Sequence, residues 1–319
     1  MTEASAAKLK PARLRPGDTV AIVAPASPWA NRSDLERAVA GLESWGLSVR
    51  VGDHVNDRHG YLAGRDEDRA ADLHRALSDP AIRAVFGLQG GYGSPRLVPL
   101  LDEAVFAGSR SAICGYSDLT TIHLARQRWS GGISFYSNGA SGVGSPETSE
   151  FSKATLHRAL FSDEPYGPVP PDPDDPYVRT LAPGRVTGRL TGGCIGLVAS
   201  TIGTRIQIDA RDRILVLEDI PVEPEDLDGP LTHLRNAGIL EQAAGIVLPH
   251  IEQKTSGYTQ SLSIEDVLEE LLEPLGVPVL VGLPIGHGKH HATVPLGALA
   301  TLDATAGTLE VEEVVTADA

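Results

Sequence analysis

The chain has 319 residues, which is enough for two domains that each bury a core of their own. With 41% hydrophobic and 22% charged residues, its composition is that of a globular protein and excludes an intrinsically disordered chain. The net charge of -15 at pH 7 argues against nucleic acid or an anionic membrane surface as the main partner.

The start of the chain and its two cysteines bear on cellular location. Residues 1–18 carry basic side chains but lack the apolar core of a secretory signal, and no later run approaches the ~20 apolar residues that span a membrane. Cys114 and Cys194 lie far apart in apolar runs, so we expect two buried free thiols and no disulfide framework. These features predict a cytoplasmic protein.

The first half of the chain alternates apolar runs with amphipathic patterns. The apolar runs predict strands at residues 18–26, 47–55, 81–90, 111–115 and 132–137. The intervening segments predict helices, the first of which we expect to be capped by Ser33 in a capping box with Glu36. Such alternation is typical of a doubly wound, flavodoxin-like parallel sheet, whose ligands lie outside the carboxyl ends of the strands.

The second half begins with a segment rich in proline. Seven prolines fall between Pro165 and Pro183, a density that a helix or a central strand does not tolerate. We therefore interpret residues 165–184 as a linker between an N-terminal α/β domain at 1–164 and a C-terminal domain at 185–319. The latter is expected to be a smaller mixed α/β unit that ends in a hairpin within residues 294–313.

The segment from Ser111 to Arg126 reads as a strand, a tight turn and a helix, with Ser117 at the turn. A serine there is exposed at the sheet edge, beside the N–H groups that begin the helix. Ser117 is therefore a candidate nucleophile. The alternative is a helix N-cap, for which serine is favoured, and Leu119 stands where the GxSxG elbow has its second glycine.

A serine nucleophile needs a base, normally a histidine, and a carboxylate that fixes the tautomer of that histidine. His287 directly follows a predicted strand and is flanked by glycines, while Glu218 ends the apolar run RILVLE. A triad of Ser117, Glu218 and His287 would straddle the two domains. Taken alone, Glu218 could be a solvated charge and His287 a loop histidine.

A glycine-rich loop, Gly90-Gly91-Tyr92-Gly93, follows the third predicted strand. Its backbone could approach a reacting carbonyl, and the N–H groups of Gly91 and Asp118 would then form an oxyanion hole. The alternative is a plain turn. Gly90, Tyr92 and the nearby Arg96 are candidate substrate contacts, although Arg96 could simply be solvated on its own helix.

The sequence GHGKHH, with His287, His290 and His291, also suggests a zinc site. Against that interpretation, the spacing is not HExxH, Lys289 adds a positive charge, and no cysteine lies near in sequence. We expect no metal and no cofactor, with His290 and His291 at the rim of the site.

In combination, these segments resemble the LD-carboxypeptidase family of serine peptidases, which includes the muramoyltetrapeptide carboxypeptidases and the microcin C immunity peptidase. The resemblance runs from about Leu14 to about Leu309. It is carried by LRPGDTVAIVAPAS, GYLAGRDEDRAADLHRALSDPAIRAVFGLQGGYG, AICGYSDLTTIHLA, GRLTGGCIGLVASTIGT, ILVLEDI, LTHLRNAGIL and GHGKHHATVPLG.

The resemblance implies a two-domain, homodimeric enzyme without a metal, whose triad falls on Ser117, Glu218 and His287. It implies an oxyanion hole at Gly91 and Asp118. The implied reaction releases the terminal D-Ala of murein tetrapeptides in cytoplasmic peptidoglycan recycling, with aminoacyl-nucleotide amides as the alternative substrate.

The chain departs from residues frequent in the family at Gln89, at Asn138-Gly139 and over 221–228, and these departures concern the identity of the substrate. A different class of function, a non-catalytic two-domain binding protein with Ser117 as a helix cap, requires that the three triad residues do not converge in space. A metallohydrolase built on GHGKHH is the remaining alternative.

Overall fold

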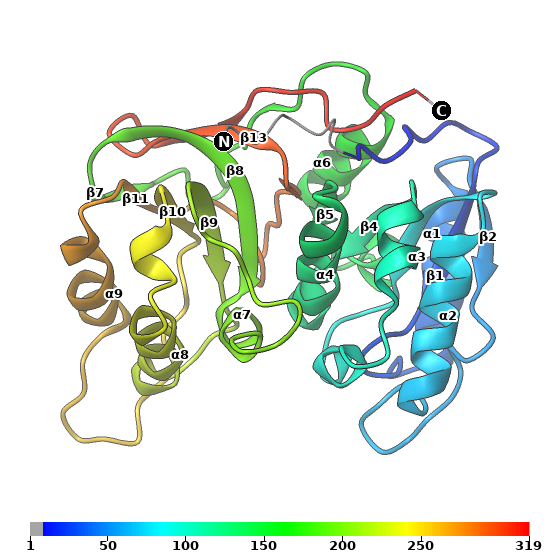
Figure 1. Cartoon of the computed structure of the whole chain (residues 1–319), viewed down its shortest axis with the longest axis horizontal. Coiled ribbons are helices and arrows are strands. Elements are labelled where there is room, and N and C mark those ends of the chain that lie inside the picture. The colour runs from blue at the N-terminus through cyan, green and yellow to red at the C-terminus, as the bar shows by residue number, and fades with distance from the viewer. Residues whose placement is uncertain (1–8, 319) are drawn as a thin grey trace.

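Two β-sheets, lying side by side, organise the fold of residues 9–318, which the computed structural model describes (Figure 1). The first sheet has the order β12-β5-β4-β3-β1-β2, in which β1 to β5 are parallel and β12 is antiparallel to β5. Its strands are β1 (Thr19–Val23), β2 (Ser48–Val51), β3 (Ile82–Gly87), β4 (Ala112–Gly115), β5 (Ser134–Tyr136) and β12 (Val294–Leu296).

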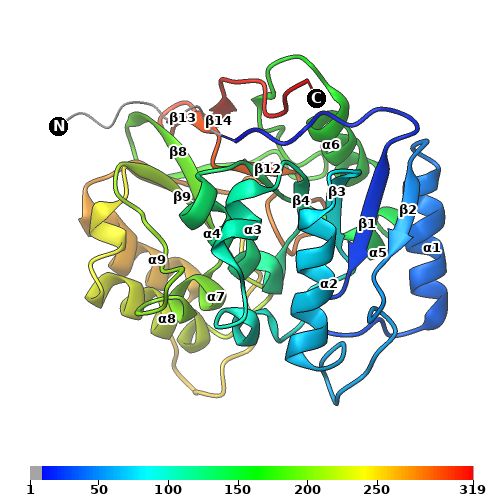
Figure 2. The same cartoon turned by 45° about the vertical axis from the view of Figure 1, so that its right-hand side comes forward.

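The parallel strands of this sheet follow the order 2-1-3-4-5, which is the flavodoxin-like order expected from the sequence. Apolar clusters lie on both faces, which explains why the strands read as nearly continuous apolar runs. Helices α2, α3 and α4 pack on one face and α1, α5 and α6 on the other (Figure 2). The helices are α1 (Arg32–Glu43), α2 (Asp66–Ser78), α3 (Glu103–Gly108), α4 (Thr120–Ser130), α5 (Ala140–Gly144) and α6 (Glu150–Phe161), with short 3₁₀ turns η1 (Ser94–Leu97) and η2 (Ser117–Leu119).

The second sheet is mixed and has the order β6-β14-β13-β8-β9-β10-β11-β7, with β8 to β11 parallel. Its strands are β6 (Gly167–Pro168), β7 (Arg179–Ala182), β8 (Arg185–Cys194), β9 (Arg213–Glu218), β10 (Gly245–Leu248), β11 (Val279–Val281), β13 (Leu299–Asp303) and β14 (Thr308–Val311). Its helices are α7 (Ile195–Ser200), α8 (Pro224–Asn236) and α9 (Ile264–Leu272), with 3₁₀ turns η3 (Leu240–Gln242) and η4 (Glu273–Leu275).

Helix α4 lies where the two sheets meet (Figure 1). Its Gln127 accepts a hydrogen bond from the Thr191 hydroxyl of β8 at 2.5 Å and donates one to the Leu190 carbonyl at 3.2 Å. One apolar cluster contains buried residues of both sheets, including Phe86 of β3 and Val216 of β9. The two sheets therefore share a core, and the turn that precedes α4 faces the second sheet.

Several local predictions need correction or refinement. Helix α1 begins after Asn31, which forms the capping box with Asp34, so the predicted cap at Ser33 is wrong. The expected terminal hairpin is formed by β13 and β14. Residues 294–296, which were expected to belong to this hairpin, instead form β12 and pair with β5 of the first sheet. Pro295 has no N–H group, and an edge strand is where a sheet accepts proline.

The proline-rich segment contributes β6 and β7, which are the two edge strands of the second sheet. Edge positions tolerate proline, which reconciles these strands with the composition of the segment. The domain boundaries at residues 164 and 185 stay a prediction. Cys114 and Cys194 are buried free thiols, as expected, and none of the described helices has the length and apolarity needed to cross a membrane.

Candidate active site

The Ser117 turn connects β4 to α4 at the carboxyl edge of the first sheet. Ser117 has a φ of 60°, a left-handed conformation that is uncommon outside glycine and that clusters at functional sites. Tyr116 is the cap residue of η2, and no side-chain capping hydrogen bond forms there, so the helix-cap interpretation of Ser117 is not supported. Gly90 lies directly against this turn, because a Cβ at Gly90 would stand 2.8 Å from Ser117 Cβ.

Glu218, the last residue of β9, and His287, in the loop that follows β11, form a hydrogen-bonded pair. Glu218, at the end of β9, is fully buried, and its Oε2 lies 2.7 Å from His287 Nδ1. The same oxygen accepts the backbone N–H of His287 at 3.2 Å. Because Nδ1–H is the donor to a carboxylate, Nε2 is left as the basic nitrogen of the ring.

Burial lowers the pKa of His287, but the hydrogen bond and charge of Glu218, together with the charge of Asp219, outweigh burial and raise that pKa above its ordinary value. The His287 side chain keeps 17% of its surface exposed. A ring that is held by a buried carboxylate and still reaches solvent is suited to move protons to and from a bound substrate.

Tyr116 and Tyr136 bring the serine turn and the Glu218–His287 pair together. The ring of Tyr116 lies 5.0 Å from that of His287, centroid to centroid. The Tyr136 hydroxyl accepts the Ser117 N–H at 3.0 Å and donates to Glu218 Oε1. The three predicted triad residues therefore lie around one point between the sheets, although none of the hydrogen bonds found among residues 9–318 joins the Ser117 hydroxyl to His287.

The glycine-rich loop and the start of η2 face the same turn. Gly91 has a φ of +105°, and within the described part of the chain its N–H group makes no hydrogen bond. Asp118 is held by Ser94 of η1: its Oδ2 accepts the Ser94 N–H at 2.6 Å, and its carbonyl accepts the Ser94 hydroxyl. Burial raises the pKa of the Asp118 carboxyl, against the effect of the Ser94 hydrogen bonds.

Two cavities flank this group of residues. The larger, about 480 Å³, is called here the Tyr116 cavity, and it is lined by Gln89, Gly90, Tyr116, Leu119, Asn138, Gly139 and residues of α1 and 141–148. The smaller, about 280 Å³, is called the His287 cavity, and it is lined by Asp172, Asp175, Tyr177, Asp219, His250, Glu252, His287, His290 and residues of 282–285. Gln89 and Asn138-Gly139, where the sequence departs from the family pattern, thus line the cavity beside the serine turn.

Tyr92 and Arg96, two of the three candidate substrate contacts, line neither of these cavities. Arg96 pairs with Asp66, its Nε standing 2.9 and 3.0 Å from the two carboxylate oxygens, and it lines neither cavity. Tyr92 is 69% exposed and packs edge-on against Tyr61 at a centroid distance of 6.3 Å. Of the three candidates, only Gly90 lines a cavity beside the triad residues.

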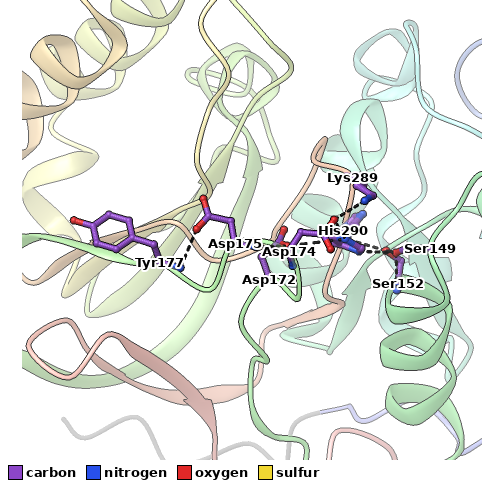
Figure 3. Close-up of polar contacts among 9 residues, drawn as sticks. Ser149, Ser152, Asp172, Asp174, Asp175, Tyr177, Lys289 and His290 are labelled. Atoms are coloured by element: carbon purple, nitrogen blue, oxygen red, sulfur yellow. Dashed lines mark hydrogen bonds and ion pairs between the residues drawn. The ribbon is translucent and has the colours of Figure 1, made fainter.

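Of the three histidines of GHGKHH, His287 and His290 have separate hydrogen-bond partners, whereas neither ring nitrogen of His291 has one among the described residues. His290 Nδ1 lies 3.0 Å from Ser149 Oγ, and its Nε2 lies 3.1 Å from Asp174 Oδ2, which also pairs with Lys289 (Figure 3). These contacts tie the proline-rich segment to the loop that carries His287.

His291 is buried near the rings of Tyr116 and Tyr136, and burial, with the charge of His287, lowers its pKa to about 3. Within the described residues, the only His, Cys, Asp or Glu side chains grouped closely enough to share a metal ion are His54, Asp57 and Asp68. The geometry therefore gives no support to a zinc site built on GHGKHH.

Sequence reasoning missed three side chains around the serine turn. They are Tyr136, Thr120 and His123. His123 is buried, and its ring nitrogens lie 2.9 Å from the Gly115 carbonyl and 2.9 Å from Ser134 Oγ. Burial lowers the pKa of His123 to about 4, so the ring is neutral and can donate to one partner while it accepts from the other.

Comparison with known proteins assigns the family. A family model described as the LD-carboxypeptidase N-terminal domain matches residues 20–137, and one described as the LD-carboxypeptidase C-terminal domain matches residues 187–302. A protein of Bacillus subtilis (strain 168), named probable murein peptide carboxypeptidase, is 35% identical over 305 residues, which cover 95% of this chain and 94% of that protein.

Two solved structures show the same architecture. The muramoyltetrapeptide carboxypeptidase from Oxalobacter formigenes superposes with a TM-score of 0.80 at 31% identity, covering 92% of this chain and 99% of that one. The microcin C7 self immunity protein in complex with aspartyl sulfamoyl adenosine gives a TM-score of 0.83 at 21% identity, covering 97% and 100%, and shows the shared fold. From both family models and a relative matched over nearly its whole length, it follows that this chain belongs to the LD-carboxypeptidase family.

Proposed function

We propose that this protein is a cytoplasmic, homodimeric serine carboxypeptidase that removes the terminal D-Ala from murein tetrapeptides during peptidoglycan recycling. The observation that carries the proposal is the hydrogen-bonded series Ser117–Tyr136–Glu218–His287, which gathers a serine, a buried carboxylate and a basic histidine from two sheets. Family membership supports the reaction class, and the names of the relatives from Bacillus subtilis and Oxalobacter formigenes support the substrate class.

In the proposed reaction, Ser117 Oγ attacks the carbonyl carbon before D-Ala and passes its proton to His287 Nε2, while Glu218 stabilises the imidazolium. The N–H groups of Gly91 and Asp118 hold the oxyanion. Collapse of the tetrahedral intermediate expels D-Ala, whose nitrogen takes the proton from His287. A water molecule, deprotonated by His287, then attacks the acyl-enzyme, and as the ester bond breaks His287 returns the proton to Ser117 Oγ.

The charge of the His287 cavity favours a murein peptide over the alternative substrate, an aminoacyl-nucleotide amide. Its lining includes the carboxylates of Asp172, Asp175, Asp219 and Glu252, and none of its described lining residues is Lys or Arg. Close carboxylates repel an anionic phosphoryl group and attract an ammonium group. The side-chain amine of a diamino acid carries such a charge, so it is the better match for this cavity.

Side-by-side turnover tests the substrate. The purified protein is incubated with a murein tetrapeptide ending in D-Ala, with the same peptide ending in L-Ala, and with an aminoacyl sulfamoyl adenosine, and products are followed by mass spectrometry. We expect release of D-Ala from the first peptide only, unaffected by a chelator. Cleavage of the nucleotide compound alone would assign the alternative function, and cleavage of none would contradict the proposal.

Gly286 provides a second prediction, because its lack of a side chain lets Glu218 reach His287. Gly286 has a φ of +83°, and a Cβ there would stand 2.0 Å from Glu218 Oε2, so Gly286→Ala must displace the carboxylate. Misplacement by about 1 Å can cost roughly 100-fold, so we expect kcat for D-Ala release to fall at least that far.

The matched control for this variant is Gly203→Ala. Gly203 has nearly the same φ, +80°, but among the described residues no atom outside its two chain neighbours lies within 4 Å of the place that a Cβ would take there. It therefore carries the same backbone penalty without touching Glu218, and its kcat is expected to stay at the wild-type value. Equal kcat for the two variants would show that the Gly286 contact does not matter.

A further inference from the structure

Two hydroxyl groups tie the backbone of Ser117 to the second sheet. The Ser117 N–H donates to the Tyr136 hydroxyl at 3.0 Å, and that hydroxyl donates its own proton to Glu218 Oε1. The Thr120 hydroxyl accepts the N–H of Cys194 at 3.0 Å and donates to the Ser117 carbonyl at 2.7 Å. Both peptide groups of this left-handed residue are thus held by hydroxyls that also contact β8 or β9.

The direction of each hydrogen bond is fixed by chemistry. An N–H group cannot accept, and an ionised carboxylate or a carbonyl cannot donate, so in these four hydrogen bonds each hydroxyl accepts from the N–H group and donates to the oxygen. The Tyr136 hydroxyl also lies within hydrogen-bond reach of the Thr120 hydroxyl. Tyr136 and Thr120 are fully buried, which leaves no water to compete for these bonds. Burial, and then the charge of Glu218, hold the pKa of Tyr136 well above its ordinary value, so its hydroxyl stays a donor.

The hydrogen bonds of the Tyr136 and Thr120 hydroxyls reach the second sheet at paired positions of β9 and β8. Cys194 of β8 and Glu218 of β9 are opposite each other in the parallel pairing of the two strands. The Thr120 hydroxyl bonds Cys194 and the Tyr136 hydroxyl bonds Glu218, so the two hydroxyls bind adjacent strands at the same register position. The parallel pairing of β8 with β9 holds these two positions next to each other. The Ser117 turn is consequently fixed relative to Glu218, even though the two residues belong to different sheets.

We propose that the hydroxyls of Tyr136 and Thr120 are positioning groups for the carboxypeptidase reaction, which hold the Ser117 turn in register with Glu218 before substrate binds. This inference rests on the proposed function, because positioning matters only if Ser117 and Glu218 act together. Neither residue contacts the substrate in this scheme.

The first test is Tyr136→Phe, which keeps the ring and removes the hydroxyl. Hydrogen bonds to a charged group of this kind correspond to roughly 10- to 100-fold, so we expect kcat to fall by that factor while KM stays within about two-fold. The acid limb of the pH profile of kcat/KM should move to higher pH, because Glu218 loses a donor and binds the protonated His287 more tightly.

A purely structural role would not move that limb. The other ionisable groups that face His287 from neighbouring elements are unchanged in this variant, and they are Tyr116, Asp172, Asp175, Asp219, His250, Glu252, His290 and His291. The shift therefore reports on the bond between Tyr136 and Glu218.

The second test is Thr120→Val, which keeps the shape of the side chain and removes its hydroxyl. We expect a similar loss of kcat with a much smaller shift of the acid limb, because Thr120 makes no hydrogen bond to Glu218. Thr120→Ser, which restores the hydroxyl, should recover most of kcat.

Two further variants serve as matched controls, because each removes a buried hydroxyl of the same kind as that of Thr120 or Tyr136. Thr121→Val removes a buried hydroxyl that has no hydrogen-bond partner among the described residues. Tyr166→Phe removes a buried tyrosine hydroxyl that donates to the Thr293 carbonyl and has no hydrogen bond to Ser117, Glu218 or His287. Both are expected to keep the wild-type kcat and pH profile.

The outcomes separate this inference from the function on which it rests. If Ser117→Ala is inactive while Tyr136→Phe and Thr120→Val keep wild-type kcat and pH profiles, the positioning role is wrong and the proposed function stands. If Ser117→Ala stays active, the proposed function fails and the positioning role fails with it. Should Tyr136→Phe not fold, as judged by circular dichroism, the loss in Thr120→Val and its recovery in Thr120→Ser decide the question.

Discussion

Replacing Ser117 with alanine is expected to lower kcat for D-Ala release by roughly 10⁴- to 10⁶-fold, because removal of a serine nucleophile leaves only binding and the oxyanion hole to accelerate the reaction. The Ser117 side chain makes no hydrogen bond within residues 9–318, whereas its backbone N–H and carbonyl are bonded to Tyr136 and Thr120. The variant retains both backbone contacts, so the fold should be unaffected.

The measurement is D-Ala release by mass spectrometry, together with the melting temperature. Ser200→Ala is a suitable control, because that serine is exposed on α7 and, within residues 9–318, its hydroxyl donates only to the Leu197 carbonyl. A Ser117→Ala protein that melts like the wild type but keeps more than about a tenth of its kcat would contradict the nucleophile assignment.

The sequence predicts the first sheet well because the apolar pattern of each of its strands lies within the strand itself. Strands covered on both faces must be apolar along their whole length, and β1 and β3 read in this way in the sequence. The position of β12 could not be predicted in the same manner. Residues 294–296 carry a strand-like pattern, but their pairing with β5 depends on contacts with residues more than a hundred positions away.

The same distinction between local and long-range signals applies to the site. Ser117, Glu218 and His287 stand out because each polar side chain ends an apolar run, and the structure gathers them at one place. Tyr136 also ends a strand, but an aromatic residue in an apolar run reads as core, so the sequence gives no local sign of what its hydroxyl binds. The ion pair of Arg96 is likewise absent from any local pattern, since its partner Asp66 is thirty residues away.

Glu218→Gln is expected to lower kcat by roughly 10³- to 10⁴-fold, close to the effect of disabling the orienting carboxylate in other triads. Glu218 accepts hydrogen bonds from Tyr136, from His287 Nδ1 and from the His287 backbone, and it is fully buried. Glutamine has the same shape, but its amide can donate to Nδ1 and so favour the tautomer in which Nε2 carries the proton and cannot act as a base.

The residual activity of Glu218→Gln also has a predicted pH dependence. In the wild type the pKa of His287 is raised in the folded protein. The protonated His287 ring therefore stabilises the folded state fully below the pKa that His287 has in the unfolded chain. This stabilisation is lost as the pH rises through the pKa that His287 has in the folded protein. Removing the charge of Glu218 lowers the pKa of His287, so the acid limb of kcat/KM should move to lower pH, opposite to the shift expected for Tyr136→Phe.

Asp219→Asn separates charge from orientation in this argument. Asp219 also raises the pKa of His287, by its charge alone, and the His287 ring has no hydrogen bond to it. Its substitution should therefore move the acid limb slightly in the same direction as Glu218→Gln, with a much smaller loss of kcat. If the two variants lost kcat equally, the special role of Glu218 in holding the tautomer of His287 would be refuted, because only one of these carboxylates is bonded to Nδ1.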